Sequence, residues 1–213
     1  MTAASRLYIF DVGGVMVDGF DVTPDIAARL GIPLSELRPL LRAADFDLLH
    51  TGRISSAEFW DRFRARTGLA VDDEYWGAFF RPLRRPRMYE LVRHLREGGE
   101  RVVAGTNTLD VHYHIHEELG DYGAFDHTYA SHLIRLAKPD PAFYRHILAA
   151  ERVTPQQALF LDDVEANVRA ADRLGIHAIQ FHTEADAVAA VEAWVGVGPV
   201  EAHANGSGPP GAS

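Results

Sequence analysis

The sequence contains no cysteine, which excludes disulfide bonds and thiolate metal sites. It also lacks an apolar run near the roughly 20 residues that a membrane-spanning helix needs, and its start, MTAASRLYIF, has no apolar core of a signal peptide. Long basic runs are absent too, and the formal net charge is -9, which argues against nucleic-acid binding. We therefore predict a cytoplasmic protein that binds a small molecule, with no membrane or nucleic-acid partner. The sequence leaves the oligomeric state open.

Short β-rich runs alternate with helical patterns along the 213 residues of the chain. The runs are residues 6–12, 101–106, 125–131, 158–163 and 177–181. Strands that alternate with helices imply right-handed crossovers between parallel strands. The predicted fold class is therefore α/β, with a doubly wound, mainly parallel, Rossmann-like sheet.

The first two predicted strands are separated by far more residues than a crossover needs. Residues 18–86 show several helical patterns with no strand among them, and we interpret them as an inserted helical cap domain. The Rossmann-like core then comprises residues 1–17 and 87–195. Residues 196–213 are rich in glycine and proline and are predicted to form a flexible tail.

Polar residues stand at the ends of the predicted strands, where doubly wound sheets bind their ligands. The set consists of Asp11, Thr106, Asn107, Lys138, Asp162 and Asp163. Carboxylates combined with a lysine, a hydroxyl and an amide suit a divalent cation and a phosphoryl group. An aspartate at a strand end can also act as a nucleophile.

Four motifs follow one another along the chain: FDVGGVMVD, GTN, KPDPAFY and LFLDDVEANVRAADRLG. With them the chain resembles the haloacid dehalogenase superfamily of hydrolases, over nearly its whole length apart from the tail. Within that superfamily the motifs are most similar to those of bacterial phosphatases that act on α-D-glucose 1-phosphate and of the N-terminal phosphatase domain of soluble epoxide hydrolase.

The resemblance implies roles for the catalytic residues. Asp11 would be the nucleophile, Thr106 would donate a hydrogen bond to the phosphoryl oxygens, and Lys138 would neutralise charge. Asn107, next to Thr106 in the motif GTN, is included as a further catalytic residue.

The resemblance also implies a Mg²⁺ cofactor. Asp11, Asp163 and the backbone carbonyl of Gly13 would hold the ion, and Asp162 would support them directly or through water. The natural partner would be a small phosphate ester.

Gly13 departs from the pattern of the superfamily, because most of its phosphatases carry an aspartate there that protonates the leaving oxygen. The backbone carbonyl survives this replacement, whereas the proton donor is lost. Asp18 or His50 could supply the proton instead. Otherwise we expect a substrate with an acidic leaving group, such as an anomeric sugar phosphate, and we note that glycine could also serve an unusual φ at this position.

His112 and His116 would share a face of a helix and could bind zinc, but the sequence offers no third ligand, so we favour surface histidines. Asn167 is given equal weight as a site residue and as an ordinary helix residue. Arg42 and Arg53 are candidates for contacting a second polar group of the substrate. The aromatic residues of the insertion are interpreted as its core; they are Trp60, Phe63, Trp76, Phe79 and Phe80.

These observations predict a Mg²⁺-dependent phosphatase that hydrolyses a small ester, with a sugar phosphate as the expected substrate, through an aspartyl-phosphate intermediate. Two alternatives stay open. One is metal-independent hydrolysis at carbon, as in the haloacid dehalogenases, which the pair Asp162 and Asp163 disfavours because unneutralised carboxylates would repel an anionic haloacid. The other is a phosphate-binding module without catalysis.

Overall fold

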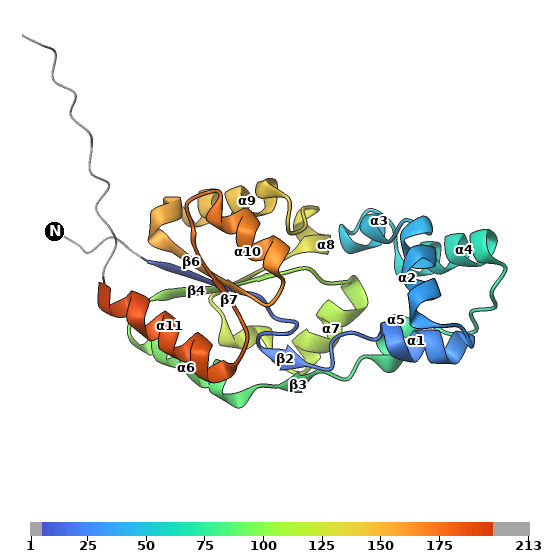
Figure 1. The fold of residues 1–213 in the computed structure, drawn as a ribbon, viewed down its shortest axis with the longest axis horizontal. Helices are drawn as coiled ribbons and strands as arrows, with labels where there is room; N and C mark the ends of the chain where they lie inside the picture. Colours follow the sequence, from blue (N-terminus) through green and yellow to red (C-terminus); the bar gives the residue numbers. More distant parts are fainter. Residues whose placement is uncertain (1–5, 198–213) are drawn as a thin grey trace, which may run out of the picture.

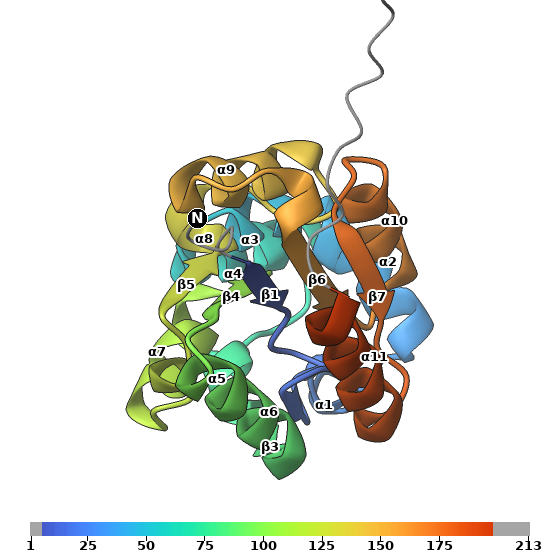
Figure 2. The same cartoon turned by 90° about the vertical axis from the view of Figure 1, so that its left-hand side faces the viewer.

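The computed structural model describes residues 6–197. Its central sheet has the strand order β5-β4-β1-β6-β7, and every neighbouring pair in it is parallel. The strands are β1 (Leu7–Phe10), β4 (Arg101–Thr106), β5 (His127–Ala130), β6 (Ala158–Asp162) and β7 (His177–Gln180). Figure 2 shows them side by side, from β5 at one edge to β7 at the other. The predicted α/β fold with a doubly wound parallel sheet is confirmed.

Helices cover both faces of this sheet (Figure 1). On one face lie α6 (Pro86–Glu97) and α11 (Glu184–Val197), and on the other lie α9 (Pro141–Glu151) and α10 (Glu165–Asp172). Side chains alternate along a strand, so β1 sends Tyr8 and Phe10 into the first layer and Leu7 and Ile9 into the second. Both sides of β1 are thus buried, which explains why its sequence is a continuous apolar run.

The remaining elements of this part of the chain complete the connections. They are α7 (Asp110–Glu118), the 3-10 turn η1 (Tyr122–Ala124), α8 (Ser131–Ile134) and the 3-10 turn η2 (Pro155–Gln157). Helix α11 runs to Val197, so the first two residues of the predicted tail are helical. The rest of that tail lies outside the described residues. Within residues 6–197, no helix has the length and apolar character needed to cross a bilayer.

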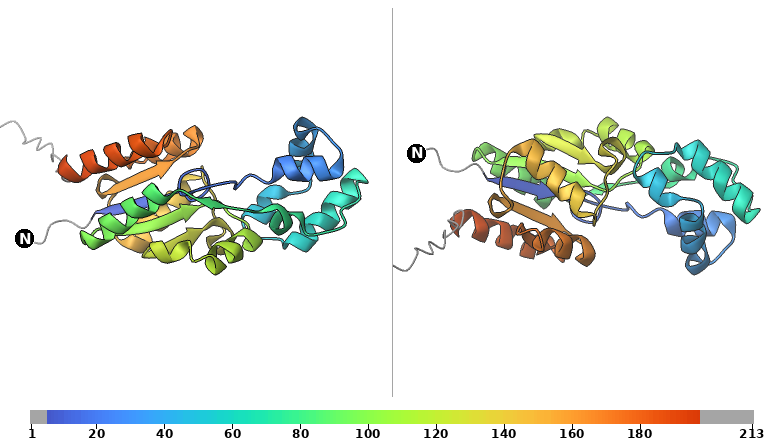
Figure 3. Two further views of the ribbon diagram at one scale, coloured as in Figure 1. Left: turned by 90° about the horizontal axis from the view of Figure 1, so that it is seen from below. Right: turned by 90° about the horizontal axis from the view of Figure 1, so that it is seen from above.

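Between β1 and β4 the chain forms helices that stand beyond one end of the sheet (Figures 1 and 3). These inserted helices are α1 (Thr23–Leu30), α2 (Leu34–Ala43), α3 (Phe46–His50), α4 (Ser56–Thr67) and α5 (Tyr75–Phe79). They enclose most of a third apolar cluster, to which Leu109 and residues of α7 also contribute.

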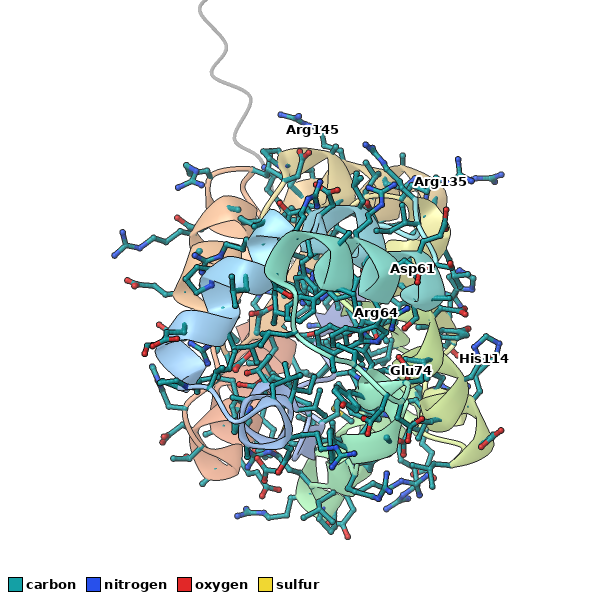
Figure 4. The ribbon with its side chains drawn as sticks, turned by 90° about the vertical axis from the view of Figure 1, so that its right-hand side faces the viewer. Asp61, Arg64, Glu74, His114, Arg135 and Arg145 are labelled. Atoms are coloured by element: carbon teal, nitrogen blue, oxygen red, sulfur yellow. The ribbon has the colours of Figure 1, made fainter. Side chains whose placement is uncertain are left out.

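Helix α4 illustrates why these segments fold as amphipathic helices. Ser55 and Glu58 form a capping box at its start, in which each side chain bonds to the backbone N–H of the other residue. Phe59 and its neighbours on the same side are buried in the apolar cluster. Asp61 and Arg64 form an ion pair on the outer side of α4, which faces the viewer in Figure 4. The helix therefore buries one face and leaves the other to solvent.

The aromatic residues predicted to form the core of the insertion lie in this cluster. Trp60, Phe63, Trp76 and Phe80 are buried, and Phe79 packs against them as a partly buried side chain. The rings of Trp60 and Trp76 stack with centroids 5.0 Å apart.

One prediction for the insertion was wrong, because residues 18–86 contain a strand. β3 (Leu83–Arg84) pairs antiparallel with β2 (Val17–Asp18), so the chain enters and leaves the inserted helices through one small sheet. Each of these strands has only two residues, which is too short to show the alternation of apolar and polar residues by which a strand is recognised in a sequence.

The inserted helices contact the sheet-bearing part through backbone that passes very close. Gly52 follows α3 with φ +60°, and a Cβ there would lie 2.1 Å from the carbonyl oxygen of His132 in α8. At Gly77 in α5, a Cβ would lie 2.7 Å from Cγ2 of Val111 in α7. Glycine at these positions allows the two parts to pack closely.

We predict that Gly52→Ala destabilises the protein more than Gly31→Ala, its matched control. Gly31 also has a left-handed φ, +69°, but nothing lies within 4 Å of its ideal Cβ. Both variants have a backbone strain of about 1 kcal/mol, and Gly52→Ala adds a backbone collision that costs about 1 to 3 kcal/mol more. Urea unfolding of the three proteins measures the difference, and equal losses in the two variants would contradict the close contact.

Candidate active site

The carboxyl ends of β1, β4 and β6 bring most of the predicted site residues together. β1 lies between the other two strands, with Phe10 level with Ala104 on one side and with Leu161 on the other. Asp11 therefore emerges between the last residues of its neighbours, Thr106 and Asp162. The side chains of Asp11, Thr106 and Asp162 are all buried. Burial of the two carboxylates is unusual and requires partners that compensate their charge.

Lys138 supplies the compensating charge for the two carboxylates. Its Nζ lies 2.8 Å from Oδ1 of Asp11 and 2.6 Å from Oδ2 of Asp162. The backbone of Lys138 is fixed by Asn107, whose Oδ1 accepts from Lys138 N at 2.9 Å and whose Nδ2 donates to Lys138 O at 2.8 Å. In this structure Asn107 therefore positions the lysine.

Asp162 is held from several directions. Besides Lys138, its carboxylate accepts from the backbone N–H of Val164 at 2.8 Å and from Nδ2 of Asn167 at 3.0 and 3.1 Å. The hydroxyl of Tyr144 donates to the carbonyl of Asn167 at 2.9 Å. Asn167 is thus part of the site's supporting structure, the first of the two interpretations given to it by the sequence.

The electrostatics of the cluster follow from burial. Burial is the largest influence on Asp11 and raises its pKa to about 7, while Lys138 and the Val12 N–H oppose that rise. Burial followed by repulsion from Asp162 also raises the pKa of Asp163. Lys138 pairs with two of the three carboxylates, Asp11 and Asp162, and added positive charge would favour the ionised forms of all three.

Three carboxylates are close enough to bind one cation. Ligand oxygens of Asp11, Asp162 and Asp163 all lie within 4.8 Å of one another. The carboxylate of Asp163 lies next to Gly14, where a Cβ would come within 2.4 Å of its Oδ2. Gly14 has φ +81°, so both its conformation and this approach favour glycine. Such hard oxygen donors suit Mg²⁺.

The sequence suggested that glycine at position 13 could serve an unusual φ, but the structure gives a different reason for it. Its φ lies outside the left-handed range, so no unusual backbone conformation requires it. Instead, a Cβ at this position would lie 3.0 Å from Cδ2 and 3.1 Å from Cγ of Phe20. The ring of Phe20 thus occupies the space that a side chain at position 13 would need.

A pocket of about 640 Å³ opens above Asp11 and extends between the sheet and the inserted helices. Asp11, Gly13, Thr106, Asn107, Lys138 and Asp163 line its floor. Residues from α2, α3 and α5 and from the Phe20 segment line the opposite side. A volume of this size is typical of small-molecule sites.

The prediction of surface histidines in α7 was wrong for His112 and His116, which are both buried. His112 Nε2 lies 3.0 Å from the carbonyl oxygen of Trp76, and His116 Nδ1 lies 2.7 Å from Oδ2 of Asp121. Phe80 stacks on the His112 ring at 3.9 Å. Both histidines line the pocket. In each, one ring nitrogen is bonded, that of His112 to the Trp76 carbonyl and that of His116 to Asp121.

The two residues suggested as replacement acids differ in position. Asp18 is exposed, pairs with Arg85 and does not line the pocket. His50 lines the pocket, but burial lowers its pKa to about 4, so its ring is neutral near pH 7 and is a poor proton donor. Of the candidate arginines, Arg42 reaches the lining and Arg53 does not.

The model of the haloacid dehalogenase-like hydrolases matches residues 6–175. The chain belongs to this family. It is 28% identical to the sesquiterpene phosphatase astK of Aspergillus oryzae over 182 residues, which are 83% of this chain and 89% of that protein.

Solved structures agree on the fold. A mutant form of a family enzyme from Bacteroides thetaiotaomicron, in complex with magnesium and inorganic phosphate, superposes with a TM-score of 0.68 at 25% identity, covering 84% of this chain and 95% of that one. The L-2-haloacid dehalogenase of Xanthobacter autotrophicus has a TM-score of 0.60 at 17% identity, covering 89% and 83%. The second likeness shows the fold alone.

The sequence did not indicate that Phe20 lines the pocket next to Gly13. The residue lies in the segment that leads from β2 to α1, and Gly19, with φ +66°, turns the chain just before it. No local pattern indicates that the ring then returns to Gly13. Tyr144 was quoted within KPDPAFY, but its bond to Asn167 joins α9 to α10 and has no sequence signature.

We predict that Asp163→Asn weakens the response of this hydrolase to Mg²⁺ before it affects anything else. The amide removes one negative oxygen from the cation cluster and leaves the bonds of Lys138 intact. Titrations of Mg²⁺ binding by calorimetry and of activity against Mg²⁺ should both move to higher concentration. The exposed Asp172→Asn on α10 is the control, and curves of Asp163→Asn that superpose on those of the control would remove Asp163 from the metal site.

Proposed function

We propose that this hydrolase is a Mg²⁺-dependent phosphatase that acts on a small phosphate ester through an aspartyl-phosphate intermediate. The observation that carries the proposal is the convergence of Asp11, Lys138, Asp162 and Asp163 at one end of the sheet, on the floor of a pocket. The similarity to a named phosphatase and to a structure that binds magnesium and phosphate supports it.

Each residue has a distinct part in the proposed reaction. Asp11 attacks phosphorus and the bond from phosphorus to the ester oxygen breaks, with the departing oxygen taking a proton from water; a water molecule then attacks the aspartyl phosphate, which releases inorganic phosphate and frees Asp11. Lys138 orients Asp11 and balances charge in the site, since its ammonium group lies 2.8 Å from the attacking carboxylate. Thr106, buried at the end of β4 and facing the pocket, would donate to a phosphoryl oxygen.

The oxygen donors fit the cofactor that the family implies. Asp11, Asp163 and the carbonyl of Gly13 would hold Mg²⁺, and Asp162, whose oxygens are already bonded to Lys138, Val164 and Asn167, would support them. When bound, the ion would stabilise negative charge on the transferring phosphoryl group. The cluster itself is net negative, which is the charge a divalent cation balances.

The alternatives make different demands on this cluster. Hydrolysis of a haloacid without metal would bring an anionic substrate beside Asp162 and Asp163, of which Asp162 is paired with Lys138. A phosphate-binding module would not need a carboxylate placed to attack. Release of chloride in the absence of Mg²⁺ would support the first, and phosphate binding without turnover would support the second.

The nature of the ester is a further part of the proposal. A sugar phosphate was expected from the sequence, whereas the relative from Aspergillus oryzae is named a sesquiterpene phosphatase. We propose that the inserted helices act as the cap that selects among such esters, because they supply the side of the pocket opposite Asp11. A cytoplasmic location remains a prediction.

We predict that Asp11→Asn abolishes phosphatase activity while the protein stays folded. The amide has the same shape but is a poor nucleophile, and Lys138 keeps its partner Asp162. Hydrolysis of phenyl phosphate with Mg²⁺, alongside circular dichroism of wild type and variant, tests this. Activity of the variant above a small fraction of that of wild type would contradict the covalent mechanism.

We also predict that leaving-group acidity controls the rate. A positioned acid typically contributes about 10²- to 10⁴-fold, and Gly13 has no side chain to supply it. Across phenyl phosphates with substituents of similar size, kcat/KM should rise steeply as the pKa of the phenol falls, and it should be low for alkyl phosphates. A flat dependence would show that another group in the pocket donates the proton.

A further inference from the structure

The contact between Gly13 and Phe20 places an aromatic ring beside the nucleophile. Phe20 is 40% exposed and lines the pocket, with Asp11 and Gly13 on the floor next to it. Because a Cβ at position 13 would come within 3.0 Å of the ring, the two positions cannot both carry large side chains without rearrangement. The site therefore has apolar surface at the place where a side chain at position 13 would project.

The apolar surface continues from Phe20 along the wall of the pocket. It is formed by Val22, Leu41, Phe46, Trp76 and Phe80, all from the inserted helices and their linkers. Four of these five side chains are also members of the buried cluster that stabilises the insertion. The wall is thus held in place by packing and does not need a ligand to form.

Several polar residues along the same pocket are already bonded within the protein. Both amide atoms of Asn107 bond to the Lys138 backbone, His112 bonds to Trp76, and Asp21 accepts from both the N–H and the hydroxyl of Thr23. The arginines of the lining, Arg38 and Arg42, are exposed. Apart from the residues assigned to the phosphate and the cation, the lining thus offers sugar hydroxyls fewer free polar groups than its composition suggests, chiefly the arginines and His50 on the side of the inserted helices.

From these observations we infer that Phe20 determines specificity, and that with Gly13 it makes the site select monophosphate esters whose alcohol is apolar next to the ester oxygen. This inference rests on the proposed phosphatase activity and replaces the sugar phosphate expected from the sequence. Phe20 contacts the organic group of the substrate and takes no part in bond breaking. Burial of hydrocarbon against such a wall strengthens binding by about fourfold for each methylene removed from water.

The test compares esters that differ in polarity and share one leaving-group chemistry. Phenyl phosphate, 4-butylphenyl phosphate and 4-(2-hydroxyethyl)phenyl phosphate release phenols of nearly equal acidity, so differences in kcat/KM report on recognition. We expect wild type to favour the butyl ester over phenyl phosphate by tenfold or more, mainly through KM, and to gain nothing from the hydroxyethyl group. A preference for the hydroxyethyl ester would overturn the inference.

Phe20→Ala should remove most of the preference for the butyl ester. The control is Leu133→Ala, which truncates another apolar side chain, 56% exposed, outside the pocket, and it should keep the wild-type ratio. An unchanged ratio in Phe20→Ala, with phenyl phosphate still hydrolysed in an Asp11-dependent way, would overturn the inference and leave the phosphatase intact. Absence of turnover of all three esters by wild type would instead refute the proposed function.

A second readout tests the Gly13–Phe20 contact without relying on activity. Gly13→Ala adds only the Cβ that meets the ring. Its effect on the urea midpoint is measured in the wild-type and in the Phe20→Ala background. We expect a less favourable effect when Phe20 is present, because the ring must then move. Strictly additive effects in the two backgrounds would overturn the pairing of these positions.

Discussion

The ammonium group of Lys138 is the interaction on which the site depends. Its Nζ lies between Oδ1 of Asp11 and Oδ2 of Asp162, and all three side chains are buried. Removing one partner from a buried ion pair typically costs about 3 to 5 kcal/mol, because the other charge is left uncompensated. The lysine is therefore the main charge that allows two carboxylates at the ends of adjacent strands to be buried together.

The rest of the core serves to bring that lysine into place. Asn107 at the end of β4 holds the backbone of Lys138 by two hydrogen bonds, and Asn167 in α10 holds the carboxylate that Lys138 contacts. Asn107 directly follows β4, Lys138 lies shortly before α9, and Asn167 lies within α10. The parallel sheet and the helices packed on it thus fix the positions of the residues in the charged cluster.

Features that depend on strand ends could be predicted from the sequence, and features that depend on distant packing could not. The motif around Asp11 and the pair Asp162 and Asp163 follow apolar runs, and parallel strands bring their carboxyl ends together whatever the rest of the chain does. The burial of His112 needs α5, which comes from a different part of the chain. Phe20 is a similar case, since only the turn at Gly19 and the path into α1 place its ring on Gly13.

The fold alone does not decide the chemistry, since the same architecture occurs in a structure of an L-2-haloacid dehalogenase and in a family enzyme that binds magnesium and phosphate. What separates the possibilities is the balance of charge around Asp11. With Asp162 bonded to Lys138, the carboxylate of Asp163 is the one left without a cationic partner among the described residues. A site for a metal-free reaction on an anion would gain nothing from that carboxylate, whereas a site that binds a dication beside a phosphoryl group gains a ligand.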